Sequence, residues 1–148
     1  MENTDAVFAA PGDTSNQAHF AQELLSLLAT QLRSRGIRAT LSNPKDDKGI
    51  AGAIVCALRD WQIHVQLDHP VRGSDSVSIW HLMCIDLPRF WLSRMFSSLP
   101  NLGLGDVVAI VHEALTRNSG IRDVEWVDEG GVDKMIDVLK RRIREASE

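Results

Sequence analysis

The sequence DWQIHVQLDHPVRGSDSVSIWHLMCIDL, residues 60–87, decides the fold. Its first part, 61–68, alternates apolar and polar side chains. Because successive side chains of a strand point to opposite faces, this pattern predicts a strand with one apolar and one polar face. Its last part, 77–87, is apolar on both faces, which is typical of a strand in the middle of a sheet. Pro70 and Gly73 predict a turn between the two strands.

The polar face of the strand at 61–68 carries the first group of candidate binding residues. Gln62, His64, Gln66 and Asp68 all point to this face. We expect helices to pack on the apolar face, so these four side chains would line the face that the helices leave open. They are therefore candidates for contact with a partner.

The remaining chain predicts an α+β domain. Gly52 indicates a bulge in one of the strands. A capping box at Thr14 and Gln17 predicts a helix that follows it to about Arg35. Helical spacing predicts two more helices, one capped by Asp106 and ending before Asn118, and one at about 131–146. Apolar runs predict strands at 37–41, 50–58 and 121–127, with 6–10 either a strand or an arm. With the two strands of 60–87, this gives a mainly antiparallel sheet of about five strands with helices packed on one face, in one domain spanning 1–148.

Composition excludes some classes of function. The chain has 16 basic and 20 acidic residues, a net charge of -4, whereas a nucleic-acid binder needs a basic surface to neutralise phosphates. Neither a signal peptide nor an apolar run of membrane-spanning length is evident, so we expect a cytoplasmic protein without membrane contact. Cys56 and Cys84 lie in apolar runs and are expected to be buried free thiols, with a disulfide between neighbouring strands as the alternative.

The histidines are the residues that a catalytic site would need. His64 and Asp68 share a strand face, with His69 next along, but four residues of a strand span about 13 Å, too far for a direct hydrogen bond. A site would need help from the neighbouring strand, for example from His81. Because His81 shares a face with Ile79 and Met83, we expect a core histidine instead. We assign no catalytic residue, metal or cofactor.

A cluster of acidic residues lies near the end of the chain. Asp123, Glu125, Asp128 and Glu129 follow one another closely, with no basic residue among them. Such a cluster attracts a basic partner and speeds their encounter. These four residues form the second group of candidate partner-binding residues.

A small acidic α+β protein with an open polar sheet face and no catalytic motif resembles bacterial immunity proteins, such as those of contact-dependent growth inhibition. The resemblance implies a non-catalytic protein, monomer or homodimer, that neutralises a cognate toxin domain. Such a toxin is often a basic nuclease, which the immunity protein blocks with an acidic surface.

Two other functions remain open. A secretion chaperone for an effector protein is also small, acidic and α+β. Its interface would be the aromatic helix predicted at 88–96, which contains Phe90, Trp91 and Phe96. A small hydrolase would have its site near His64 and Asp68.

Overall fold

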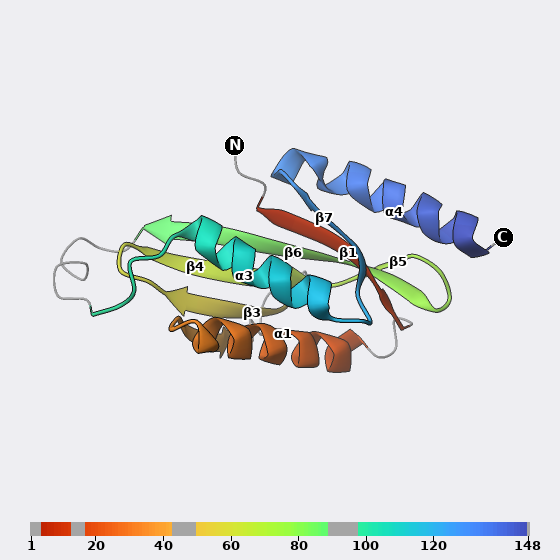
Figure 1. Ribbon diagram of the computed structural model, residues 1–148. Helices are drawn as coiled ribbons and strands as arrows, with labels where there is room; N and C mark the ends of the chain where they lie inside the picture. The colour runs from red at the N-terminus through yellow and green to blue at the C-terminus, as the bar shows by residue number, and fades with distance from the viewer. Residues whose placement is uncertain (1–3, 13–16, 43–49, 89–97, 148) are drawn as a thin grey trace.

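A seven-stranded antiparallel sheet forms the centre of the protein in a computed structural model that describes residues 4–12, 17–42, 50–88 and 98–147 (Figure 1). The strand order is β2-β3-β4-β6-β1-β7, and the short β5 pairs with β6. The strands are β1 (Asp5–Pro11), β2 (Arg38–Ser42), β3 (Ile50–Ala57), β4 (Trp61–Asp68), β5 (Val71–Arg72), β6 (Val77–Pro88) and β7 (Arg122–Val127).

The part of the sheet formed by 38–88 confirms the predicted strands and their antiparallel pairing. β2, β3, β4 and β6 are neighbours in this order, and β4 has the predicted bounds. The pairing of β3 with β4 shifts register between Ile50 and Gly52, which confirms the bulge expected at Gly52. The expected turn contains β5, two residues that pair with Ser78 and Ile79 of β6.

The apolar run near the N-terminus is a central strand. β1 lies between β6 and β7, and its residues from Asp5 to Ala10 are buried. A strand in this position has helices or neighbouring strands on all sides, which explains why the run is apolar on both faces.

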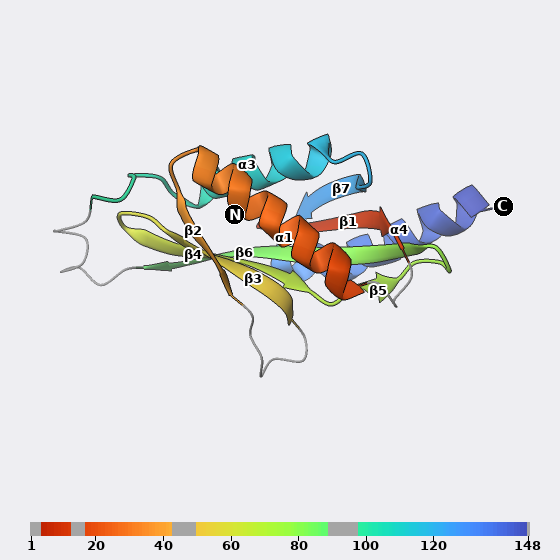
Figure 2. The same ribbon diagram turned by 90° about the horizontal axis from the view of Figure 1, so that it is seen from below.

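Two helices cover one face of the sheet. α1 (Gln17–Ser34) packs on β2 and β3, and α3 (Leu104–Arg117) packs on β6 and β7 and against α1 (Figure 2). Gly36 follows α1 with φ +83, the left-handed conformation expected of a residue that ends a helix. The main core between the helices and the sheet includes Phe8, Leu28, Leu32, Ile54, Ile63, Val65, Leu67, Leu82, Val111 and Leu115.

The terminal helix departs from the prediction. The α+β class, the antiparallel sheet and the packing of helices against it are confirmed, but α4 (Val132–Ser147) lies on the face opposite α1 and α3. Its Leu139 and Ile143 form a second, smaller core with Val7, Ala9 and Ile79, which alternate with the residues of the main core. A short 3-10 turn, Glu129–Gly131, connects β7 to α4.

The start of α3 also differs from the prediction. Asp106 is predicted to precede the helix as its cap, but the cap position belongs to Gly103. Asp106 lies three residues later, and its carboxylate accepts a hydrogen bond of 2.9 Å from the backbone N–H of Gly103. The acidic side chain thus stabilises the helix from inside the first turn, where it also interacts favourably with the helix dipole.

The aromatic helix, the two cysteines and the absence of a membrane-spanning helix are the remaining predictions about the fold. Of the aromatic helix predicted at 88–96, Pro88 ends β6, and 89–96 lie outside the described residues. Cys56 and Cys84 are buried and free, and burial raises the pKa of each thiol to about 12. None of the described helices combines the length and the apolar character required to cross a bilayer.

Candidate functional site

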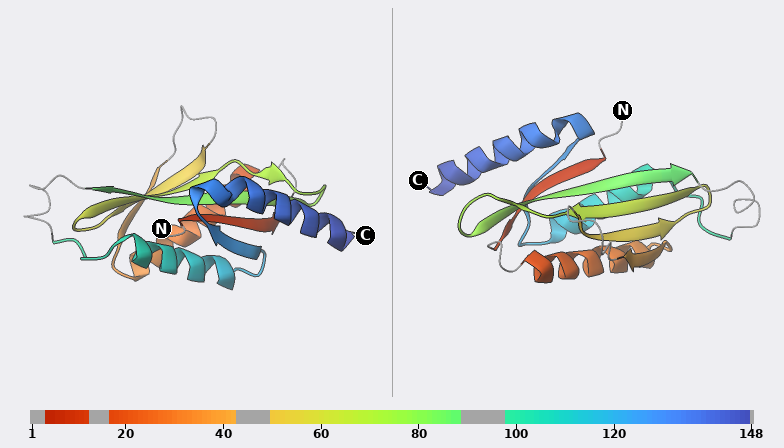
Figure 3. Two further views of the ribbon diagram at one scale, coloured as in Figure 1. Left: turned by 90° about the horizontal axis from the view of Figure 1, so that it is seen from above. Right: turned by 180° about the vertical axis from the view of Figure 1, so that it is seen from behind.

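The face of the sheet opposite α1 and α3 is only partly covered by α4. Seen from this side, β3, β4 and β6 lie in front of α3, and α4 runs beside them (right panel of Figure 3). Register places Val55 of β3, His64 of β4 and Ile85 of β6 side by side in one row, and Gln66 beside Met83 in the next. We call the surface formed by Val55, Gln62, His64, Gln66, Met83 and Ile85 the open face.

The open face combines a polar and an apolar row. Its β4 row consists of Gln62, His64 and Gln66, as the sequence predicts. Its β6 row consists of Met83 and Ile85, both half-buried. The solvated face of an antiparallel sheet is normally polar, so half-exposed apolar side chains in the middle of this face are the unusual component.

His64 has an unsatisfied polar atom. Its Nε2 is buried and finds no hydrogen-bond partner among the described residues. A buried nitrogen without a partner costs about 1–3 kcal/mol, so such atoms are rare in folded proteins. The imidazole in the middle of the open face therefore has one nitrogen that no described residue satisfies.

Beside the open face, three side chains from three strands form a hydrogen-bonded triad. His81 of β6 contacts Asp68 of β4 through Nδ1, at 3.0 Å from Oδ2, and Asp5 of β1 through Nε2, at 2.8 Å from Oδ1. The other oxygen of Asp5 accepts a hydrogen bond of 3.0 Å from the Thr4 hydroxyl. Asp5 is only 3% exposed. We call Asp5, Asp68 and His81 the histidine triad.

The triad favours the charged form of His81. Burial alone would lower the pKa of the imidazole, but the hydrogen bonds and charges of Asp68 and Asp5 outweigh burial and raise the pKa above its ordinary value of 6.5. When both ring nitrogens donate to carboxylates, neither is available to accept a proton from a substrate. The geometry therefore gives His81 the role of a structural cation rather than that of a general base.

The structure separates the residues that a hydrolase site would have combined. Asp68 turns to His81, and no hydrogen bond joins it to His64. His81 lies on the face of Ile79 and Met83, as predicted, and its side chain, which is 16% exposed, contacts two carboxylates. Asp5 was missed because the sequence does not show that β1 pairs with β6 in a register that places this carboxylate near His81.

The acidic cluster is partly neutralised within the protein. Arg142 of α4 lies 3.7 Å from Asp123 and 3.5 Å from Glu125, measured between its Nη1 and a carboxylate oxygen of each. Asp128 and Glu129 are exposed between β7 and α4 and form no ion pair with the described residues. Of the four predicted acidic residues, these two therefore present their full charge to solvent.

The two predicted groups of binding residues lie apart. β6 and β1 separate β4, which carries Gln62 to Asp68, from β7, which carries Asp123 and Glu125. α4 packs on this intervening part of the sheet. A partner that contacts both groups would therefore have to reach across α4.

Both edges of the sheet have features that hinder pairing with another strand. At β2, Arg33 donates a hydrogen bond of 2.9 Å to the carbonyl oxygen of Ala39 and so occupies one group of the edge. At β7, the register with β1 shifts between Val7 and Ala9, and Asp123 adopts a positive φ of 57. Bulges and side chains that occupy backbone groups are known means of protecting sheet edges.

Within the described ranges, no group of three or more His, Cys, Asp or Glu side chains is arranged to hold a metal ion. In the triad, the imidazole lies between the carboxylates, so the three side chains do not converge on one point. Comparison with protein-family models, with curated proteins and with solved structures finds no match for this chain.

Proposed function

We propose that the protein is a non-catalytic binding protein that neutralises a cognate protein, in the manner of a bacterial immunity protein that blocks a secreted toxin domain. We further propose that the open face carries the contact. The function of an immunity protein requires only a stable surface that is complementary to its target.

The observation that carries this proposal is the apolar row of the open face. Met83 and Ile85 are half-buried in the middle of a sheet and have no described helix above them. Gln62, His64 and Gln66 lie along one side of this row. An apolar centre with polar side chains around it is the usual composition of a protein interface.

Charge supports a basic partner. Asp128 and Glu129 are exposed beside α4, and the protein has a net charge of -4. Complementary charge accelerates association, and this acceleration becomes smaller as the ionic strength rises. We expect charge reversal at both positions to slow association with the partner about tenfold at low salt.

The enzyme alternative, a small hydrolase with its site near His64 and Asp68, has less support, because Asp68 hydrogen-bonds His81 and no hydrogen bond joins it to His64. The secretion-chaperone alternative depends on 88–96, which includes residues outside the described part of the chain.

Partner capture from the native host tests the proposal. The tagged protein, the variant Ile85→Glu and the control Leu27→Glu are purified at low salt, and co-purifying proteins are identified by mass spectrometry. Leu27 is 37% exposed on α1, on the opposite side of the sheet, so its substitution introduces the same charge elsewhere. Circular dichroism confirms that each variant is folded, and Gln66→Arg replaces Ile85→Glu if the latter does not fold.

We expect the wild type and Leu27→Glu to recover one stoichiometric protein that the open-face variant loses. Expressed alone, this protein should arrest growth, and co-expression with the wild type should relieve the arrest. If the open-face variant recovers the same protein in equal amount, the proposed surface is wrong. If no protein is recovered, or if the recovered protein is harmless, the proposed function is wrong.

A further inference from the structure

We infer that a pocket at the C-terminal end of α4 binds a small carboxylate with a short apolar tail. The pocket has a volume of about 280 Å³ and lies between α4, the turn before β6 and the start of β7. Its polar lining includes Ser74, Ser76, Arg122, Asp123 and Arg142. We call it the arginine pocket. This inference is independent of the proposed function.

A bulge in β7 turns Arg122 toward the pocket. Glu125 pairs with Val7 and Arg122 pairs with Ala9, so two residues of β7 lie opposite Phe8 alone. Without the extra residue, Arg122 would point to the face of Phe8; with it, Arg122 shares the face of Ala9 and α4. Asp123 makes this possible by adopting a φ of 57, a conformation that aspartate tolerates better than most residues.

Arg122 retains an unpaired charge. Among the described residues no acidic side chain forms an ion pair with it, whereas Arg142 lies near both Asp123 and Glu125. Arg142 pairs with Asp123 and Glu125, so the guanidinium of Arg122 is the charge of the pocket lining that no described residue pairs with. One negative charge on a ligand would balance this charge, which favours a monocarboxylate over a doubly charged phosphate.

The opposite wall supplies hydroxyl groups. Ser74 Oγ accepts a hydrogen bond of 3.3 Å from the backbone N–H of Ser76, so its own hydrogen is free to be donated. The backbone of the turn is fixed, because the N–H groups of Gly73 and Ser74 both donate to the carbonyl oxygen of Val77. A guanidinium on one wall and serine hydroxyls on the other are suitable donors for a carboxylate.

The floor of the pocket is apolar. Val77 and Ile143 line it together with two alanines, Ala9 and Ala146. A volume near the lower limit of about 300 Å³ for ligand pockets restricts the occupant to a small molecule. The arginine pocket therefore fits a short aliphatic or aromatic carboxylate, with the carboxylate at Arg122 and the tail on the floor.

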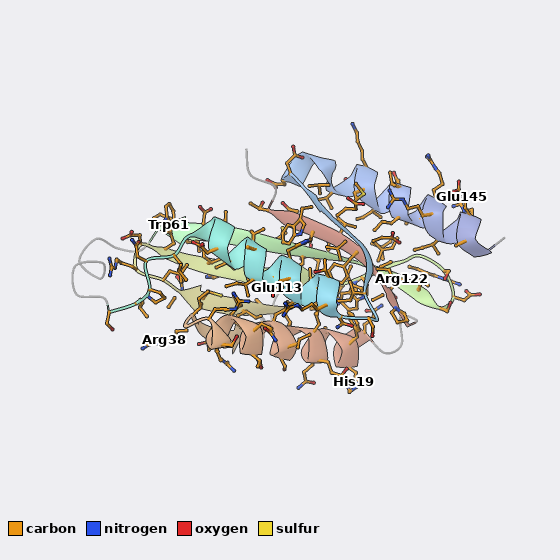
Figure 4. All side chains as sticks on the ribbon, viewed as in Figure 1. His19, Arg38, Trp61, Glu113, Arg122 and Glu145 are labelled. Atoms are coloured by element: carbon orange, nitrogen blue, oxygen red, sulfur yellow. The ribbon has the colours of Figure 1, made fainter. Side chains whose placement is uncertain are left out.

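Hexanoate, with neutral hexanamide as the matched compound, tests this inference. Each is titrated into the full-length protein at low salt, and binding is followed by the backbone amide signals in NMR. The variants are Arg122→Gln and, as control, Arg38→Gln. Arg38 and Arg122 each begin an edge strand, both are exposed, and neither forms an ion pair with a described residue (Figure 4).

We expect hexanoate to shift the signals of Ser74, Ser76 and Arg122 saturably. Hexanamide should bind at least tenfold more weakly. Arg122→Gln should weaken hexanoate binding at least tenfold, and Arg38→Gln should leave it unchanged. Shifts that do not saturate, equal binding of the amide, or binding that survives Arg122→Gln would each overturn the inference.

Discussion

At the scale of single residues, His81 is the side chain with the most unusual environment. It links β4, β6 and β1 through two carboxylates, of which Asp5 is almost completely buried. Removing one member of such a group leaves a buried charge without compensation, which costs more than the intact interaction contributes. We therefore expect the triad to fix the relative positions of three strands beside the open face.

The triad predicts a dependence of stability on pH. Because the pKa of His81 is raised in the folded protein, its contribution to stability is fully present below its ordinary value of 6.5 and is lost as the pH rises through the folded pKa. Across this window the free energy of unfolding should fall by at most about 1.4 kcal/mol per pH unit. Urea unfolding at a series of pH values measures this slope.

Asp68→Asn isolates the contribution of the triad. The amide oxygen can still accept the hydrogen bond from Nδ1, but the negative charge is lost, so the pKa of His81 should fall toward its ordinary value. The slope above pH 6.5 should therefore become smaller. The control is Asp75→Asn, which changes a carboxylate that is 91% exposed and pairs with Arg72. An unchanged slope in Asp68→Asn would contradict this assignment.

Single residues also show what the sequence could and could not predict. Alternation in 61–68 correctly predicts that His64 and Gln66 point away from the main core. The contact of His81 with Asp5 depends on the register between strands 76 residues apart in the chain. No local pattern contains this register, so the triad could not be predicted.

At the scale of elements, α1 is positioned closely over β3 by a glycine. A Cβ atom added to Gly52 would lie 2.4 Å from Cδ1 of Leu25, a residue that is only 5% exposed. The absence of a side chain at Gly52 thus allows the helix to approach the strand. The bulge at the same position explains why the sequence places glycine inside an otherwise apolar strand.

Gly52→Ala should destabilise the protein by about 1–2 kcal/mol, because Leu25 must move within a packed core. Gly105→Ala is the matched control: it lies in α3 and a Cβ there would contact nothing within 4 Å. It should stabilise the protein by about 0.5–1 kcal/mol through helix propensity. Urea unfolding measures both changes. A Gly52→Ala variant as stable as the wild type would contradict the close approach of α1 to β3. In a protein that already carries Leu25→Ala, the destabilisation caused by Gly52→Ala should largely disappear.

The face chosen by a helix is harder to predict than the helix itself. The spacing of Leu139 and Ile143 correctly predicts that α4 has an apolar side. It does not show which face of the sheet this side packs on, that of Phe8 or that of Val7. Both faces of β1 are buried, so neither face is excluded. Among the described residues, α1 and α3 precede β7 and occupy the first face, and α4 covers the second.

At the scale of the whole molecule, the part of the chain that the structure describes leaves little of the sheet uncovered other than the open face. α1 and α3 cover one side, α4 covers part of the other, and Arg33 and the bulge at Asp123 protect the two edges. The sequence predicts the class of fold and the polar row of β4. It could not predict that the described helices leave Met83 and Ile85 uncovered, because this depends on where α4 packs.

The measurement that tests the central claim most directly is hydroxyl-radical footprinting of the protein with and without its captured partner. Methionine is readily oxidised where it is accessible. Met83 lies on the open face, and Met135 of α4 is half-buried beside the smaller core and acts as an internal control. If the open face is the contact, the partner should reduce oxidation of Met83 at least severalfold and leave that of Met135 unchanged. Equal oxidation of Met83 in the free and bound protein would contradict the claim.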